Sequence, residues 1–171
     1  MVSAVATHTG LTHGGPFNPA GGLRGEPAVY YPTGKRSFVR LMARAELEGV
    51  ANAMFAKELG LRRVYVLQDP SLKIEFADPF RRTARRLGIQ IAGVANFSDG
   101  SKHDRLAERV ARSGAQGVFI AGLGSVGGGR AVMALRERLG SRIKIMAVDP
   151  YLPIAEVLAF AGTAAHGLYF S

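Results

Sequence analysis

Short apolar runs alternate with amphipathic stretches along most of the chain, beginning near Ser37. The runs VYVL, VFIAG and IKIMAV are almost continuously apolar, as expected for parallel strands whose two faces are both covered by helices. Glycines follow the amphipathic stretches at separations of 28, 26 and 26 residues, namely Gly60, Gly88, Gly114 and Gly140. A glycine just past a helix takes the left-handed conformation without steric cost, so this spacing predicts one repeated strand–helix unit.

The same pattern locates the individual elements. Strands are expected at residues 1–5, 37–43, 62–69, 89–97, 117–123, 142–149 and 166–171, and helices at 46–59, 78–87, 103–113, 130–139 and 153–162. Asp78 is predicted to cap the second helix, with Pro79 in its first turn. Residues 8–35, rich in Gly, Pro and Thr, are expected to form a long loop. Right-handed crossovers make the strands parallel, so the predicted fold class is α/β, a three-layer α/β/α parallel sheet.

Composition narrows the class of protein. The chain has 171 residues, 47% hydrophobic and 20% charged, which suits a globular domain. The absence of cysteine excludes disulfides, zinc–thiolate sites and thiol catalysis. No window contains 18 uninterrupted apolar residues, so no membrane span is predicted. The first residues lack a basic region followed by a long apolar run, so we expect no signal peptide in this chain.

The net charge of +9 raises the question of a nucleic-acid partner. The densest basic cluster is Arg81, Arg82, Arg85 and Arg86, which share one polar face of one predicted helix. No aromatic residues interleave with these arginines, and no RNA-binding or zinc-finger pattern accompanies them. The cluster is therefore interpreted as a solvated helix face, and no nucleic acid is expected to bind.

One glycine-rich segment permits a second interpretation. Gly122, Gly124 and Gly127 spell G-x-G-x-x-G between a strand and a helix, and Asp149 ends the next strand, as in a dinucleotide-binding oxidoreductase. Two further glycines extend the run and are expected to delay the helix start, and Asp149 lies 27 residues after Gly122 rather than about 20. Dinucleotide binding is kept as the alternative, and no cofactor is expected.

Other catalytic patterns are absent from the sequence. Ser125 has Leu123 two residues before it, so it lacks the glycine of a nucleophile elbow. The four histidines lack metal-ligand spacing, and no pair of carboxylates is visibly placed for acid–base chemistry. We therefore expect neither catalytic residues nor a metal site, and the protein is not predicted to be an enzyme.

Several segments together resemble a known family. YYPTGKRSFVRLMAR followed by EGVANAMFAKELGLRRVYVLQD is similar to the segment that crosses between lobes in type I periplasmic binding proteins. FADPFRRTARRLGIQIAGVANF, ARSGAQGVFIAGL and ALRERLGSRIKIMAVDPY continue in the order and spacing of that family. The branch that the chain resembles is the leucine and branched-chain amino-acid-binding proteins of ABC importers.

The resemblance implies a fold and a domain organisation. Each lobe of such a protein is a flavodoxin-like parallel sheet, and the two lobes close on a ligand. Residues 1–60 resemble a remnant of lobe one with the crossing segment, and residues 61–171 resemble lobe two. The opening units of lobe one have no counterpart here, so the chain alone is expected to bind weakly or not at all, or to be a truncated lobe without ligand-binding activity. Surfaces that face the missing lobe are expected to favour self-association.

The resemblance also implies a ligand site. Thr7 matches the hydroxyl residue of lobe one that holds the ligand's charged backbone groups, and Asp149 matches the acid of lobe two that takes the ammonium group. Leu123 occupies a position, often aromatic in the family, that packs the ligand. The acid that opens the crossing helix in the family falls at Ala45, beside Glu46. Implied partners are an amino acid or similar small polar ligand and an ABC permease, and the implied location is the periplasm.

Overall fold

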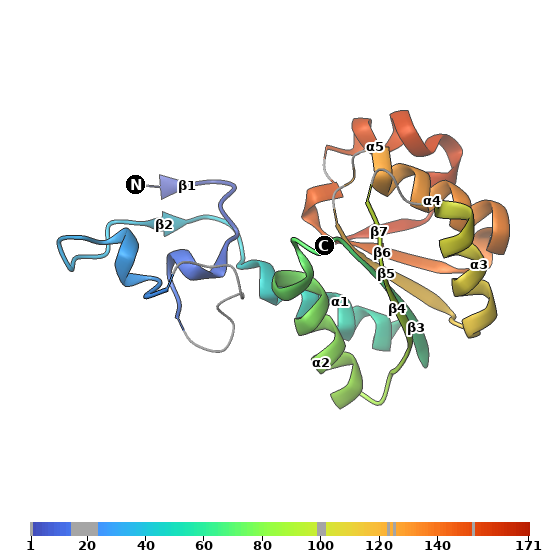
Figure 1. Ribbon diagram of the computed structural model, residues 1–171, viewed down its shortest axis with the longest axis horizontal. Coiled ribbons are helices and arrows are strands. Elements are labelled where there is room, and N and C mark those ends of the chain that lie inside the picture. Colours follow the sequence, from blue (N-terminus) through green and yellow to red (C-terminus); the bar gives the residue numbers. More distant parts are fainter. Residues whose placement is uncertain (1, 15–23, 99–101, 123, 125, 152) are drawn as a thin grey trace.

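The computed structural model describes residues 2–14, 24–98, 102–122, 124, 126–151 and 153–171. Strands alternate with helices after residues 1–44, which we call the N-terminal segment, as Figure 1 shows. The strands are β1 (Val2–Ser3), β2 (Val39–Arg40), β3 (Arg63–Gln68), β4 (Gln90–Asn96), β5 (Gly117–Ala121), β6 (Lys144–Ala147) and β7 (Leu168–Phe170). The α-helices are α1 (Ala45–Glu58), α2 (Asp78–Arg86), α3 (His103–Ser113), α4 (Val126–Leu139) and α5 (Ile154–Ala161).

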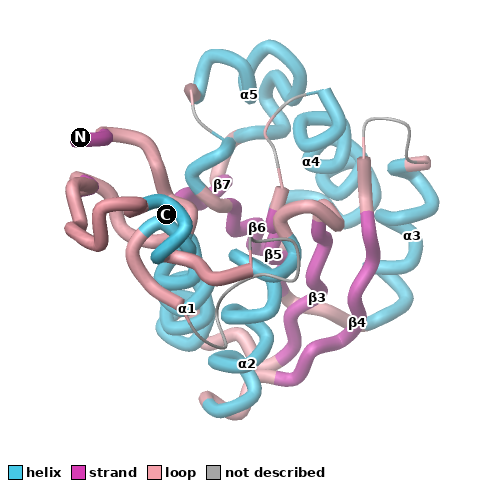
Figure 2. The backbone as a smooth tube through the Cα atoms, turned by 60° about the vertical axis from the view of Figure 1, so that its left-hand side comes forward, coloured by secondary structure: helices cyan, strands magenta, loops and turns pink. Residues whose placement is uncertain are grey.

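Five of the strands form one parallel sheet in the order β4-β3-β5-β6-β7 (Figure 2). The chain leaves β3 for β4 on one side and then crosses back to β5 on the other side. The strand order therefore reverses between β3 and β5, as in flavodoxin-like sheets. This arrangement confirms the predicted α/β/α fold class.

Alternate side chains of the central strands enter two separate cores. From β3, Val64 and Val66 point to the face covered by α1 and α2, whereas Tyr65 and Leu67 point to the face covered by α3 and α4. All five residues of β5 are buried. Helices on both faces thus explain why these strands are apolar along their whole length.

An aromatic stack marks the centre of the first core. The rings of Phe80, from α2, and Phe119, from β5, lie parallel with centroids 4.1 Å apart, and both side chains are fully buried. Ala45, Ala53 and Ala56 of α1 pack in the same core. The crossing helix, which the boundary at residue 60 assigns to lobe one, therefore packs on the sheet.

The four predicted stop glycines all follow helices and have positive φ, between 67° and 77°. The prediction for Asp78 was wrong. A π-helical turn, Lys73–Ala77, runs directly into α2, so Asp78 has helical dihedral angles and caps nothing. Its carboxylate instead pairs with Arg81 one turn later, at 2.8 Å.

The start of α4 was also predicted wrongly. The helix begins at Val126 rather than Arg130, so it includes the glycines that were expected to delay it. Tertiary packing explains the difference, because a Cβ atom on Gly129 would lie 2.4 Å from the Cβ of Phe160 in α5. The absence of a side chain at Gly129 lets α5 approach α4 closely, which outweighs the poor helix propensity of glycine.

The N-terminal segment extends away from the sheet (Figure 1). Its two short strands, β1 and β2, pair in parallel, and two single 3-10 turns, Thr9–Leu11 and Ala28–Tyr30, lie between them. Residues 15–23 of the predicted long loop lie outside the described residues. None of the helices in the described part of the chain has the length and apolarity to cross a bilayer.

The contact at Gly129 yields a test in which propensity and packing predict opposite signs. Gly129→Ala should stabilise an isolated helix by about 1 kcal/mol. We expect it instead to lower the free energy of unfolding by about 1–3 kcal/mol, because the added methyl group overpacks the α4–α5 contact. Urea denaturation measures the difference. Arg130→Ala, at an exposed neighbouring position, should change stability by less than about 0.5 kcal/mol, and stabilisation by Gly129→Ala would contradict the packing argument.

Candidate functional site

The reversal of strand order places the expected site beyond the carboxyl ends of β3 and β5. Gln68, the last residue of β3, is buried, and its amide donates to the side-chain oxygen of Asn96 at 2.9 Å. Asp69 follows, and its carboxylate accepts hydrogen bonds from the backbone N–H and the hydroxyl of Ser71 at 2.8 and 2.6 Å. The edge is therefore lined by polar groups, most of which are already engaged with one another.

The first turn of α1 joins this edge to the N-terminal segment. The backbone N–H of Ala45 is a helix-start donor without an intrahelical partner, and it donates to the carbonyl oxygen of Thr7 at 3.0 Å. Arg40 fixes the same loop, since its guanidinium donates to the carbonyl oxygens of Thr7 and His8, both at 3.0 Å. Thr7 is half-buried there.

Glu48, one turn into α1, reaches the end of β6. Its Oε2 atom accepts hydrogen bonds from the backbone N–H of Asp149 at 3.1 Å and from the hydroxyl of Ser171 at 3.2 Å. Glu48 is 8% exposed. The Asp149 side chain is half-buried, and its Oδ1 atom is buried with no hydrogen-bond partner among the described residues. The two carboxyl groups therefore lie together at the carboxyl edge of the sheet.

These two carboxyl groups cannot both ionise freely. Burial raises the pKa of Glu48 to about 7, and the charge of Asp149 adds to the shift, while the hydrogen bond from the Asp149 N–H opposes it. Burial also raises the pKa of Asp149. Because two neighbouring carboxylates repel each other, the Glu48–Asp149 pair retains a proton at pH values where an isolated carboxyl group has lost it.

The structure brings two of the three predicted site residues to the same helix start. Thr7 contacts Ala45, and Asp149 contacts Glu48, three residues or about 4.5 Å further along the helix axis. Leu123 lies outside the described residues. That the three bind a ligand remains a prediction, because the contacts show their placement and not their function.

Sequence reasoning missed Glu48. Glu46 was noted instead, but its buried carboxylate is held by the Thr9 hydroxyl and by Arg44, whose Nε atom lies 2.8 Å from Oε1. The one signal for Glu48 was its position in the first turn of the crossing helix. Nothing in the sequence indicates its partner, which is 101 residues away.

The contacts of the glycine-rich segment disfavour the dinucleotide alternative. The Gly124 N–H, which would face a pyrophosphate, donates to the carbonyl oxygen of Pro150 at 3.0 Å. A Cβ on Gly122 would lie 2.4 Å from the Phe97 ring, so the close backbone approach there serves packing. The backbone N–H of Asp149, the residue that would face the ribose, donates to the Glu48 carboxylate at 3.1 Å.

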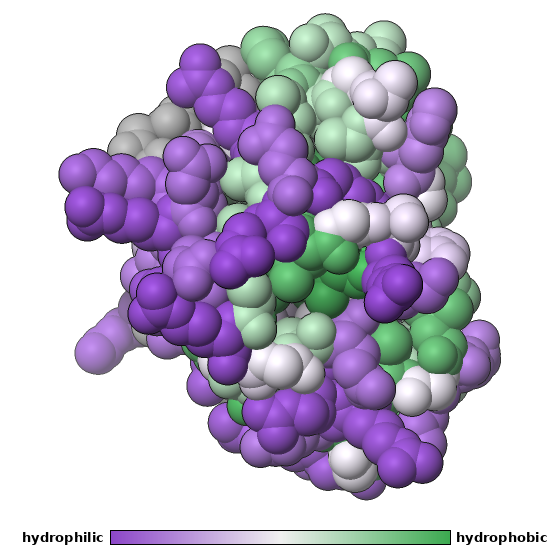
Figure 3. Space-filling view, turned by 90° about the vertical axis from the view of Figure 1, so that its right-hand side faces the viewer, coloured by the Kyte–Doolittle hydropathy of each residue, from purple (hydrophilic) through white to green (hydrophobic). Residues whose placement is uncertain are grey.

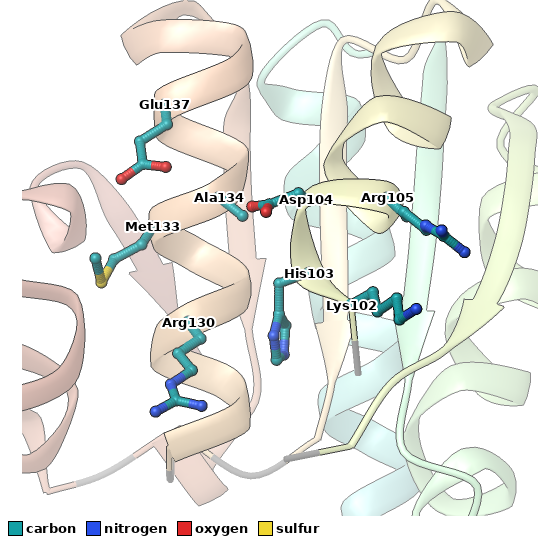
Figure 4. A pocket seen from close by; sticks show the side chains of 8 residues that line it. All are labelled: Lys102, His103, Asp104, Arg105, Arg130, Met133, Ala134 and Glu137. Atoms are coloured by element: carbon teal, nitrogen blue, oxygen red, sulfur yellow. The ribbon is translucent and has the colours of Figure 1, made fainter. Parts of the chain in front are cut away.

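The outer surface of the sheet unit carries a shallow groove of about 570 Å³ between α3 and α4. Polar residues dominate this face, with a smaller apolar area among them (Figure 3). In the close view of the groove, His103 and Arg130 lie between the two helices, whereas Lys102 and Arg105 point away from α4 (Figure 4). Neither Thr7 nor Asp149 lines the groove. Within the described ranges, no group of three or more His, Asp or Glu residues is placed to hold a metal ion.

No protein family and no curated protein matches the sequence. Solved structures do match. A leucine-binding protein from Thermotoga maritima is 24% identical with a TM-score of 0.69, and the match covers 78% of this chain and 38% of that one. A branched-chain amino acid ABC transporter from Thermus thermophilus with bound valine is 20% identical, also with a TM-score of 0.69, over 78% and 35%. A solute-binding protein of an ABC transporter from R. palustris, in complex with 4-hydroxybenzoate, is 17% identical with a TM-score of 0.63, over 77% and 37%.

These likenesses show the fold. The chain has the parallel α/β sheet of a lobe of the type I periplasmic binding proteins, as the resemblance implied. The matched structures include a leucine-binding protein, a branched-chain amino acid ABC transporter with bound valine, and an ABC transporter substrate-binding protein in complex with leucine. This chain spans less than two fifths of the length of each.

The Glu48–Asp149 pair should make stability depend on pH. The folded-state pKa of Glu48, about 7, exceeds its ordinary value of 4.5, so between these pH values the folded protein binds more protons than the unfolded chain. The free energy of unfolding should therefore fall, by about 1–2 kcal/mol, as pH rises through this window. We expect Glu48→Gln to remove that slope in urea denaturation at several pH values.

A matched control is Glu58→Gln, which neutralises an exposed carboxylate at the other end of α1. It should leave the slope of the parent protein intact. A parent whose stability is flat between about pH 4.5 and 7 would show that the two carboxyl groups do not share a proton.

Proposed function

We propose that this chain is part of the solute-binding component of an ABC importer, and that it contributes one wall of a cleft for an amino acid or a similar small polar ligand. The observation that carries the proposal is the meeting of Thr7, Glu48 and Asp149 at the start of α1, on the edge where a sheet of this order binds ligands. The fold likeness to leucine- and valine-binding proteins supports the same ligand class.

Asp149 is the group that receives the ligand's ammonium. Its Oδ1 atom is buried and has no partner among the described residues, so it offers an acceptor at the cleft. A hydrogen bond to a charged group contributes about 1.5–3 kcal/mol. Glu48 lies behind Asp149 and adds negative charge when the shared proton leaves. The pair is thereby suited to a cationic group and unsuited to a bare anion.

Thr7 and Leu123 complete the proposed contacts. Arg40 and Ala45 hold the carbonyl oxygen of Thr7 at the helix start, and the Thr7 hydroxyl is proposed to hold the charged backbone groups of the ligand. Leu123 comes two residues after the end of β5 in the sequence and is proposed to pack the apolar part of the ligand. Affinity then comes from pairing both charged ends of the ligand, without any chemical step.

The neighbours suggest the setting in which the protein works. Other matched structures are described as an extracellular ligand-binding receptor from Rhodopseudomonas palustris and a substrate-binding periplasmic protein from Ralstonia solanacearum. We infer an extracytoplasmic location, with an ABC permease as the partner that receives the ligand. The 4-hydroxybenzoate complex shows that this fold also accepts ligands without an amino group, so the acid pair is what favours an amine here.

Titration of amino acids tests the proposal. We expect leucine and valine to shift the amide resonances of Glu48 and Asp149 with dissociation constants in the millimolar range, about 4 kcal/mol, because the chain supplies one part of a cleft. Asp149→Asn should weaken this binding about tenfold to a hundredfold. Binding should also weaken as pH falls below about 7, since the shared proton competes with the ammonium group.

Asp104→Asn is the matched control, because it removes the same charge from an exposed position on α3. It should leave the affinity unchanged. If no amino acid shifts these resonances in the parent, the chain is a folded lobe without ligand-binding activity. Equal affinity in Asp149→Asn and the parent would remove Asp149 from the site.

Self-association is a separate proposal, which rests on the N-terminal segment. Val2, Val5, Val39 and Leu41 there are 58–78% exposed, an unusual concentration of large apolar side chains. We expect light scattering to show dimers or larger species whose share rises with protein concentration. Leu41→Lys should shift the distribution towards the monomer, whereas Leu158→Lys, at a 46% exposed position on α5, should not. A monomer at all concentrations would contradict the proposal.

A further inference from the structure

A histidine joins the N-terminal segment to the sheet unit. His8 follows Thr7, and its Nδ1 atom is hydrogen-bonded to the carboxylate of Glu75, in the π-helical turn that follows β3. Its Nε2 atom lies 3.2 Å from the carboxylate of Glu26, which belongs to the N-terminal segment. One imidazole ring thus bridges two carboxylates from parts of the chain that are 18 and 67 residues away.

This geometry specifies the protonation state of the ring. A neutral imidazole has one N–H donor and one bare nitrogen, so it can satisfy a single carboxylate. Carboxylates at both nitrogens are satisfied together when the ring is an imidazolium, which donates from both. In the neutral form, a lone pair would face one of the carboxylates.

The surroundings are built around the two carboxylates. The Glu26 side chain is fully buried and also accepts a hydrogen bond from the Tyr30 hydroxyl at 2.5 Å. A Cβ on Gly10 would lie 2.0 Å from a Glu26 oxygen, so this position leaves room for the carboxylate. The Glu75 side chain is 14% exposed. A cation close by is Arg40, whose guanidinium donates to loop carbonyl oxygens, including that of His8 at 3.0 Å.

We propose that His8 is a pH-dependent latch, which in its protonated form holds the N-terminal segment against the Lys73–Ala77 turn. The latch requires no ligand and so does not depend on the proposed function. Burial lowers the pKa of His8, but the hydrogen bonds and charges of Glu75 and Glu26 outweigh burial, so the net shift is upward. A raised pKa means that the contact is fully formed below the ordinary pKa of histidine and is lost as pH rises through the folded-state value.

The latch also bears on the cleft. His8 adjoins Thr7, and the turn that carries Glu75 follows directly from the switch-point end of β3. If the His8–Glu75 contact opened, the Ala45–Thr7 hydrogen bond and the Thr9–Glu46 hydrogen bond would still connect the N-terminal segment to the start of α1. The expected motion is therefore a swing of the N-terminal segment about the start of α1.

Distance measurement between two spin labels tests the latch directly. The chain has no cysteine, so Lys35→Cys and Arg86→Cys, both at exposed positions, place one label on each part. We expect a narrow distance distribution at about pH 5.5 and a broad one at about pH 9. The ratio of closed to open molecules should fall about tenfold for each unit by which the closed-state pKa of His8 exceeds the open-state value.

His8→Gln should give the broad distribution at both pH values, because glutamine cannot carry the bridging charge. Glu75→Gln, which leaves His8 in place, should do the same and should return the pKa of His8 towards its ordinary value in an NMR titration. His166→Gln, an exposed histidine of the sheet unit, should keep the pH response of the parent. A pH-independent distribution in the parent, or a pH response that survives in His8→Gln, would overturn the proposal.

Discussion

The first turn of α1 connects the N-terminal segment to the ends of β6 and β7 by hydrogen bonds. Its unpaired N–H groups and the favourable end of its dipole attract oxygen atoms and acidic side chains. The Ala45 N–H donates to the carbonyl oxygen of Thr7. The Glu46 carboxylate accepts from the Thr9 hydroxyl and pairs with Arg44. The Glu48 carboxylate accepts from the Asp149 N–H and the Ser171 hydroxyl. Successive residues on a helix point in different directions, so one turn fastens the N-terminal segment, the end of β6 and the end of β7. The proposed site exists because these fastenings converge, and a different start for this helix would separate Thr7 from Asp149.

The parts that sequence reasoning predicted correctly are those fixed by local chemistry. Stop glycines and apolar strands depend on backbone conformation and on burial of both sheet faces, so the order and approximate positions of β3 to β7 followed from the pattern, although β1 and β2 are shorter than predicted. The error at Asp78 has a local cause, whereas those at α4 and Glu48 occurred where distant contacts decide. Asp78 lies inside a helix because a π-helical turn precedes it, and α4 starts early because Phe160 packs on Gly129. Glu48 was missed for the same reason, since its role depends on Asp149, which is far along the chain.

The chain carries a net positive charge, but acidic side chains gather around the start of α1. The net charge is +9, and the exposed arginines of α2 account for part of it. Around the start of α1, by contrast, Glu26, Glu46, Glu48, Glu75 and Asp149 gather within a short series of contacts. His8 offsets Glu26 and Glu75, Arg44 offsets Glu46, and a shared proton offsets one of the remaining two. The Glu48–Asp149 pair is neutralised by a proton alone, and on the proposed function an ammonium group takes the place of that proton.

Both titrating clusters are weakened as pH rises, but for different chemical reasons. The His8 bridge is an attraction between unlike charges, so loss of a proton weakens it. The Glu48–Asp149 contact brings like charges together, so loss of its proton creates a demand for a cation. On the latch proposal, rising pH loosens the N-terminal segment, and on the proposed function it makes the acid pair a stronger acceptor for an amine. On the two proposals together, the cleft opens and becomes receptive under the same conditions, while acid conditions hold it closed around a neutralised pair. A ligand with an ammonium group would neutralise the Glu48–Asp149 pair without that proton. Capture of an amine would then depend on the protonation of these two residues, which the sheet edge already holds in place.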